Sequence, residues 1–290
     1  MRAGLVQLTV GDDPAANLPV TIDHIRRAVA GGAGFVLTPE CSNALSGNRA
    51  HQRAVLRHEE DDNTLAALRD EAARAGIWLL IGSIGVLTHD ADGRFANRSF
   101  LISPTGEIAA RYDKIHMFDV NVSDTEIYRE SSAYRPGTAA VMADAGFAKI
   151  GMAVCYDLRF PHLFRSLAQA GAQILTVPAA FNHITGAAHW EVLLRARAER
   201  SELLQQIEEA KRQRNAARRG FNLLRNRDDW QRAEIERSLE VAAEQLQLTG
   251  NVSAALAEDV GTGDLTALLT PPDKQACARV ICRSAATLAG

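Results

Sequence analysis

The chain has few cysteines, no long apolar run and no strong excess of charge of either sign. Its 290 residues contain four cysteines, at positions 41, 155, 277 and 282, whose spacing forms no repeated C-x-x-C pair and predicts no disulfide framework. No apolar run approaches the ~20 residues that a membrane-spanning helix needs. The formal net charge of −3 gives no reason to expect nucleic acid or an anionic membrane as a partner. We therefore expect no membrane association, and the first ten residues read as a strand rather than as a signal peptide.

Short apolar strands and amphipathic helices alternate along the first 198 residues. The strand-like segments are residues 5–10, 34–38, 77–84, 98–103, 149–154 and 173–177. The helical segments are residues 18–30, 63–75, 162–170 and 188–198. Alternation of this kind predicts a layered α/β domain.

Three chemically active side chains each follow an apolar, strand-like segment. Cys155 comes directly after the run at residues 150–154, and Glu40 and Lys114 also follow strand-like segments. An acid, an amine and a thiol are the groups that a thiol-dependent amide hydrolase needs. The carboxylate of Glu40 can take the thiol proton, and the ammonium of Lys114 can stabilise the thiolate and then an oxyanion. The backbone N–H of Tyr156, next to the thiol, is a candidate second oxyanion donor.

The same residues also allow a purely structural interpretation. Cys155 could be a packed core thiol, with Glu40 and Lys114 forming a buried ion pair. Sequence position alone leaves both interpretations open. Cys41, next to Glu40, is expected to point to the opposite face of an extended strand and to pack there.

Three histidines raise the question of a metal site. His116, His183 and His189 do not stand at helical ligand spacing beside a carboxylate or a cysteine. We therefore predict no metal and no cofactor, and we interpret these histidines as hydrogen-bonded structural residues. Thiol chemistry at Cys155 would require a reducing compartment, which predicts a cytoplasmic location.

Six motifs along residues 1–198 occur in an order that is typical of one family. They are LVQL at 5–8, LTPE at 37–40, YDKIH at 112–116, YRES at 128–131 with PG at 136–137, AVCYDLRFP at 153–161, and AAHWEVLLRARA at 187–198. Together they resemble the nitrilase, or carbon–nitrogen hydrolase, superfamily, and specifically its Nit-type amidases. The resemblance implies an αββα sandwich with Glu40 as general base, Lys114 as electrostatic stabiliser and Cys155 as nucleophile. It also implies that Glu130 positions the lysine and the substrate.

The resemblance further implies a substrate class. Arg159, Phe181 and Thr185 fall where Nit-type amidases bind the carboxylate of an α-keto or deaminated peptide substrate, and a planar guanidinium can hold a carboxylate bidentately. A structural ion pair of Arg159 with Asp157 or another acid is the alternative. The implied reaction is hydrolysis of a small carboxylated amide through a thioester, with release of ammonia or an amine. Deaminated glutathione is the first candidate substrate, and an ω-amide of an α-keto acid is the second.

The sequence departs from the Nit-type pattern after residue 198. Residues 199–248 show an interrupted heptad spacing, which predicts an antiparallel helical hairpin and weakly resembles the coiled-coil arm of seryl-tRNA synthetases. The basic residues between 211 and 219 suit either an RNA contact or an ordinary solvated helix face. Residues 249–290 resemble the N-terminus of quinolinate phosphoribosyltransferase, a short α+β segment without that enzyme's barrel.

These resemblances predict three parts, at residues 1–198, 199–248 and 249–290. The first would be a nitrilase-like sandwich without its C-terminal strands, and this incompleteness could lower activity by misplacing catalytic groups. Two hypotheses for the whole chain follow. One is an active amidase, which could form a homo-oligomer. The other is a catalytically impaired mosaic chain that acts as an interaction protein through its helical hairpin.

Overall fold

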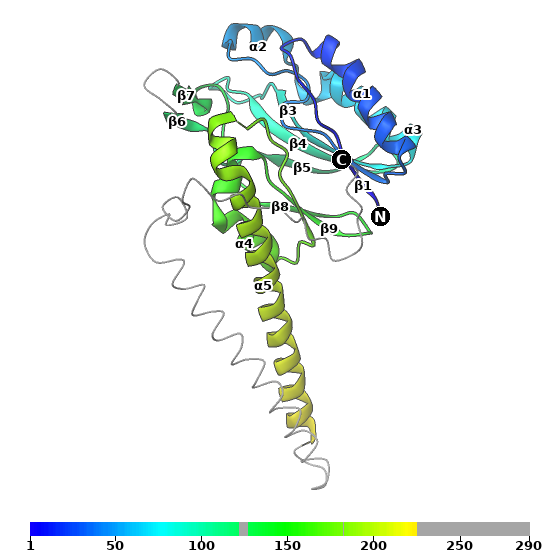
Figure 1. Cartoon of the computed structure of the whole chain (residues 1–290), viewed down its shortest axis with the longest axis vertical. Helices are drawn as coiled ribbons and strands as arrows, with labels where there is room; N and C mark the ends of the chain where they lie inside the picture. The colour runs from blue at the N-terminus through cyan, green and yellow to red at the C-terminus, as the bar shows by residue number, and fades with distance from the viewer. Residues whose placement is uncertain (122–126, 182, 225–290) are drawn as a thin grey trace. The chain divides into compact units, whose positions relative to one another are not determined.

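Two β-sheets lie face to face between two layers of helices in residues 1–198 (Figure 1). The computed structural model describes residues 1–121, 127–181 and 183–224. The larger sheet has the order β1-β2-β3-β4-β5, formed by β1 Ala3–Leu5, β2 Phe35–Leu37, β3 Trp78–Val86, β4 Ala96–Ile102 and β5 Ile108–Asp113. The smaller sheet has the order β10-β9-β8, formed by β8 Val141–Asp144, β9 Lys149–Met152 and β10 Ile174–Thr176. A two-stranded ribbon pairs β6 Asp119–Asn121 with β7 Ile127–Arg129.

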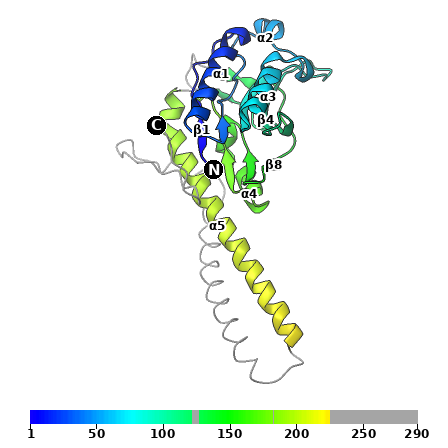
Figure 2. The same cartoon turned by 90° about the vertical axis from the view of Figure 1, so that its right-hand side faces the viewer.

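The helices cover the outer faces of the two sheets. The described α-helices are α1 Pro14–Ala30, α2 Arg49–Val55, α3 Asn63–Ala75, α4 Pro161–Gln169 and α5 His183–Leu224. Helices α1 and α3 pack on the larger sheet, and α4 packs on the smaller one (Figures 1 and 2). Short 3-10 helices occupy Glu59–Asp61, Glu130–Ser132 and Cys155–Arg159. The predicted αββα sandwich is therefore confirmed.

Both faces of the larger sheet are buried, because its central strands are apolar at consecutive positions. Leu79 and Ile81 of β3 share a hydrophobic core with Leu68 of α3. Leu80, between them, belongs to a second core that contains Met152 of β9. Since successive side chains of a strand point to opposite faces, β3 joins the helical layer to the facing sheet. The strand ends that leave these two cores carry the candidate site residues.

Helix α3 agrees with its prediction, whereas several strands do not. Helix α3 has the predicted bounds, because the Asp62 side chain accepts the N–H of Leu65 at its start and Gly76 ends it with a φ of 64°. The strand predicted at residues 5–10 is wrong in extent, since β1 ends at Leu5 after pairing three residues with β2. Strands β5 and β8 were not predicted. Lys114 consequently follows β5 and not the strand predicted at 98–103.

The last described helix begins earlier than predicted, and it joins two segments that were predicted as separate helices, residues 188–198 and the first helix of the hairpin. Helix α5 starts at His183 rather than at residue 188, and it continues without a break through the predicted boundary at residue 198. Residues 187–219 contain neither glycine nor proline, so no residue type in that stretch ends a helix. The predicted second helix of the hairpin and the segment 249–290 lie outside the described residues. None of the described helices has the length and apolarity that a bilayer crossing demands.

Gly82 on β3 lies where the chain leaves no room for a side chain. A Cβ at this position would overlap the carbonyl oxygen of Thr38 and lie 2.6 Å from the Cβ of Pro178. We expect Gly82→Ala to lower the free energy of unfolding by about 3 kcal/mol in urea titrations, because the segment before Glu40 must move. Gly47→Ala is the control, since its Cβ would meet nothing within 4 Å. Equal urea midpoints for the two variants would contradict this account of the packing.

Candidate active site

The ends of three strands bring Glu40, Lys114 and Cys155 together. Glu40 lies three residues beyond β2, Lys114 directly follows β5, and Cys155 opens the 3-10 helix that comes soon after β9. All three side chains are buried, with residue exposures of 6%, 2% and 7% respectively. A buried ionic group is tolerated only when it is paired and hydrogen-bonded, so the contacts of these residues decide what they can do.

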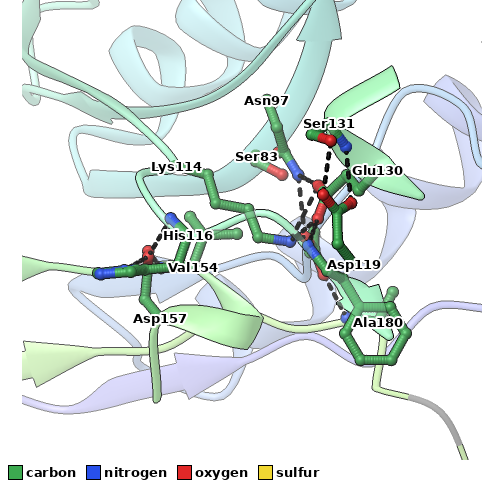
Figure 3. A network of polar contacts seen from close by, with 12 residues as sticks. Ser83, Asn97, Lys114, His116, Asp119, Glu130, Ser131, Val154, Asp157 and Ala180 are labelled. Atoms are coloured by element: carbon green, nitrogen blue, oxygen red, sulfur yellow. Dashed lines mark hydrogen bonds and ion pairs between the residues drawn. The ribbon is translucent and has the colours of Figure 1, made fainter. Parts of the chain in front are cut away.

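Two carboxylates hold the ammonium of Lys114. Its Nζ lies 3.0 Å from Oε1 of Glu40 and 3.0 and 2.8 Å from the two carboxylate oxygens of Glu130 (Figure 3). Burial alone would lower the pKa of Lys114, but the negative charges of Glu40 and Glu130 outweigh it and raise that pKa well above the ordinary lysine value. The lysine is therefore a fixed positive charge.

Glu40 is held as a carboxylate beside a neutral thiol. Burial would raise the pKa of Glu40, but the charge of Lys114 and hydrogen bonds from the Ala180 N–H and the Cys155 thiol lower it below its usual value. Burial and the negative charge of Glu40 raise the pKa of Cys155 well above the usual thiol value. The resting site thus holds a proton on sulfur and an acceptor for it on Glu40, which is the arrangement a general base requires.

Asn97 is a site residue that the sequence analysis missed. Its Nδ2 donates to Oε1 of Glu40 at 2.9 Å and to Oε1 of Glu130 at 3.4 Å (Figure 3). Asn97 lies on β4 next to the buried Ala96, so an amide within a largely buried strand was the available signal. The backbone N–H of Phe118 donates to the other oxygen of Glu130 at 2.6 Å. Glu130 thereby contacts the lysine, and its role in positioning the lysine and the substrate stays a prediction of the family resemblance.

The nucleophile candidate lies in an unusual backbone conformation. Cys155 has a φ of 48°, in the left-handed region that non-glycine residues rarely adopt. Its backbone N–H donates to the Pro178 carbonyl at 2.9 Å, which helps to hold the turn. Tyr156 lies in the first turn of the 3-10 helix Cys155–Arg159, where a backbone N–H has no intrahelical acceptor. That N–H stays a candidate donor to an oxyanion.

Aromatic rings surround the guanidinium of Arg159. Its Cζ lies 5.8 Å from the ring centre of Tyr156 and 5.9 Å from that of Phe181. Its Nη2 lies 3.1 Å from Nδ1 of His189. Thr185 lies in the first turn of α5 and is half-buried. The structure thus brings Tyr156, Phe181 and Arg159 together next to the nucleophile turn.

The ion pair of Arg159 with Asp157, the structural alternative, is not formed. Asp157 is fully buried, and its two oxygens meet Tyr112, His116 and Val154 instead. Among the described residues Arg159 has no carboxylate within ion-pair distance. A cation without a fixed counter-charge is suited to bind an anionic group of a ligand.

Cys41 is buried as predicted, but it does not lie on a strand. It lies in a turn with a φ of 54°, and its backbone N–H donates to Oγ of Ser83 at 2.9 Å. The prediction of an extended strand was wrong because β2 ends at Leu37, three residues before Glu40. Burial, followed by the negative charge of Glu40, raises the pKa of the Cys41 thiol above its ordinary value. Cys41 is therefore an inert neutral thiol.

One group of possible metal ligands occurs in the described part of the chain, away from these residues. The candidate ligand atoms of His58, Glu60 and His89 lie within 4.8 Å of one another. The rings of His58 and His89 stack at 4.2 Å with an angle of 4° between their planes. Nearly parallel rings direct their in-plane lone pairs along parallel planes, so these two nitrogens do not converge on one ion.

Comparison with known proteins gives one family. The carbon–nitrogen hydrolase family matches residues 2–203. The deaminated glutathione amidase of Yersinia enterocolitica is 41% identical over 198 residues, which cover 68% of each chain. Human omega-amidase NIT2 is 34% identical over 197 residues, covering 68% of this chain and 70% of that protein. Nit3 of Saccharomyces cerevisiae, a solved member of branch 10 of the nitrilase superfamily, superposes with a TM-score of 0.59 and 30% identity, covering 68% of this chain and 70% of that one.

The chain spans only part of the length of these relatives. Nitrilase homolog 2 of Dictyostelium discoideum, 37% identical over 193 residues, is covered over 58% of its length. The matched region contains every candidate site residue, from Glu40 to Thr185.

The lowered pKa of Glu40 and the raised pKa of Cys155 give a test of the interaction between these two side chains. Glu40 raises the pKa of the Cys155 thiol through its charge and its hydrogen bond, whereas Lys114 lowers it. We expect Glu40→Gln to move the pH midpoint of iodoacetamide alkylation at Cys155 downward by at least one unit, because only the raising charge is removed. Mass spectrometry of the Cys155 peptide follows the reaction, with Glu60→Gln, on the exposed surface, as the control. An upward or absent shift would show that Glu40 does not hold the thiol proton in place.

Proposed function

The chain belongs to the carbon–nitrogen hydrolase family, and on that premise we propose that it hydrolyses a small carboxylated amide with Cys155 as nucleophile. The observation that carries this proposal is the buried Glu40 carboxylate, which accepts from the Lys114 ammonium at 3.0 Å and lies close enough to Cys155 for its charge to raise the pKa of the thiol. A packed core thiol would need neither a neighbouring base nor a fixed cation. Burying two charges lowers the free energy of unfolding through their desolvation, and a catalytic role would explain why they are buried.

The first half of the reaction forms a thioester. Glu40 takes the proton of the Cys155 thiol as the sulfur attacks the amide carbonyl carbon. The ammonium of Lys114 and the N–H of Tyr156 stabilise the oxyanion of the tetrahedral intermediate. Glu40 then returns the proton to the amide nitrogen, the C–N bond breaks, and ammonia or an amine leaves.

The second half releases the acid. Glu40 takes a proton from a water molecule, whose oxygen attacks the thioester carbon. The C–S bond breaks when the second tetrahedral intermediate collapses, and the sulfur regains a proton from Glu40. Glu130 and Asn97 hold Lys114 and Glu40 in place through both halves, since each contacts the cluster without contacting the sulfur.

The guanidinium of Arg159 supports a carboxylated substrate. It lies four residues after the nucleophile, between two aromatic rings, and no described carboxylate neutralises it. Two of the relatives are named as a deaminated glutathione amidase and an omega-amidase. We propose deaminated glutathione as the first substrate candidate and an ω-amide of an α-keto acid as the second, with Phe181 and Thr185 lining the carboxylate end.

The setting of the enzyme also remains a proposal. A nucleophilic thiol works only while it is reduced, which supports the cytoplasm as its location. A homo-oligomer stays a prediction of the sequence analysis. The competing hypothesis, a silent interaction protein, gives no account of the buried cluster of Glu40, Lys114 and Glu130.

Replacing the nucleophile should abolish turnover without unfolding the protein. We expect Cys155→Ala to lower kcat for the ω-amide of an α-keto acid by at least about a thousandfold, because no thioester can form. Cys155→Ser should be nearly as inactive, since a hydroxyl is much harder to deprotonate. Ammonia release measures the rate, and circular dichroism checks the fold. Wild-type turnover in Cys155→Ala would disprove the proposed mechanism, and Cys41→Ser, at the inert buried thiol, is the matched control.

Arg159→Lys tests the carboxylate site. Lysine keeps the charge but loses the planar fork, so we expect KM for a carboxylated amide to rise about tenfold with little change in kcat. KM for a neutral amide of the same length should stay within a factor of two. An equal rise for both amides, or a lower melting temperature with unchanged KM, would mean that Arg159 has a structural role.

A further inference from the structure

Asp157 is a fully buried carboxylate that the proposed mechanism does not use. Its Oδ1 accepts the backbone N–H of His116 at 3.0 Å and lies 2.7 Å from Nδ1 of the same residue. Its Oδ2 accepts the backbone N–H of Val154 at 2.8 Å and the hydroxyl of Tyr112 at 2.7 Å. Four hydrogen bonds to one carboxylate are what a buried ionic group needs to offset its desolvation.

These four hydrogen bonds join the two segments that carry the reactive groups. Val154 immediately precedes the nucleophile Cys155, whereas Tyr112 and His116 each lie two residues from Lys114. Figure 3 shows Asp157 between Val154 and His116. The two segments leave different sheets, since Lys114 follows β5 of the larger sheet and Cys155 follows β9 of the smaller one. Asp157 is therefore a single acceptor shared across the sandwich.

Its charge has the wrong sign for activating the thiol. A further carboxylate near Cys155 disfavours a thiolate, and Lys114 already has two carboxylate partners. The geometry therefore indicates that Asp157 holds other groups in position and does not activate the thiol by its charge. Resting on the proposed function, we propose that Asp157 is a positioning residue that fixes the distance between the Cys155 thiol and the Lys114 ammonium.

The pattern of donors explains why this residue has to be a carboxylate. Each oxygen accepts one backbone N–H, from His116 on one side and from Val154 on the other. An asparagine has one acceptor oxygen and one NH2 group, so in either orientation its NH2 faces one of these two N–H donors. Asp157→Asn must therefore release either the lysine segment or the nucleophile turn, although it is almost the same size as aspartate.

The test compares Asp157→Asn with two matched variants. Tyr112→Phe removes one hydrogen bond from the carboxylate but keeps both backbone links. Asp62→Ala removes a buried carboxylate that caps α3 and makes none of the four hydrogen bonds of Asp157. We expect kcat per folded molecule to fall about a hundredfold in Asp157→Asn, as a displacement of about 1 Å can cause, with KM within a factor of two. In the two matched variants kcat should stay within a factor of three.

Alkylation of Cys155 supplies a readout that needs no substrate. The contacts with Glu40 and Lys114 set the pKa of the thiol, so its alkylation midpoint should move by at least one pH unit in Asp157→Asn and stay fixed in both matched variants. A kcat within threefold of wild type together with an unmoved midpoint would overturn the positioning role. A wild type without amidase activity would overturn the proposed function instead, and the alkylation midpoints would then decide on Asp157.

If Asp157→Asn does not fold, amide hydrogen exchange of the wild-type protein tests the proposal instead. In the wild type, the N–H groups of Val154 and His116 lose their acceptor together when the shared carboxylate moves. We expect their protection factors to agree within about fivefold, as for one cooperative opening. A larger difference would show that the two segments open independently and would overturn the proposal.

Discussion

The buried ammonium of Lys114 is the constraint on which the site depends. Removing one partner from a buried ion pair costs about 3–5 kcal/mol, so Glu40 and Glu130 must both stay within reach of it. Glu40 follows β2, Lys114 follows β5, and Glu130 opens a 3-10 helix beyond the β6–β7 ribbon. One cation therefore fixes three segments that are far apart in sequence. The same contacts leave Glu40 ionised and the thiol protonated, so the charge pattern that stabilises the site also prepares the proton transfer.

The larger sheet supplies this constraint with its low dielectric surroundings. Its central strands are apolar on both faces, and Asn97 is a buried amide that β4 directs at the two carboxylates. Gly82 lets the segment that leads to Glu40 approach β3 more closely than any side chain would allow. Close backbone packing and a desolvated charge cluster are thus two parts of one arrangement, since water admitted beside β3 would weaken every ionic contact in it.

The sequence pattern predicted a layered α/β domain, and the family resemblance implied the αββα sandwich that the structure has. The bounds predicted for α3 agree with the structure, and the apolar run before Cys155 contains strand β9. Strand β5 was missed because residues 108–113 include two alanines and an aspartate, residue types that are depleted in strands. The sequence analysis did not connect Asn97 with Glu40 and Glu130, or Asp157 with Tyr112 and His116, because these partners lie 33 to 57 residues away. The local spacing of residues in the sequence does not indicate contacts between residues so far apart.

The left-handed backbone conformation at Cys155 lowers the stability of the fold. A side chain in this region costs about 1–2 kcal/mol relative to glycine, which adopts it freely. Glycine at position 155 would relax the turn and, under the proposed function, abolish the reaction in a single step. A gain in stability at this position would then be made at the expense of turnover.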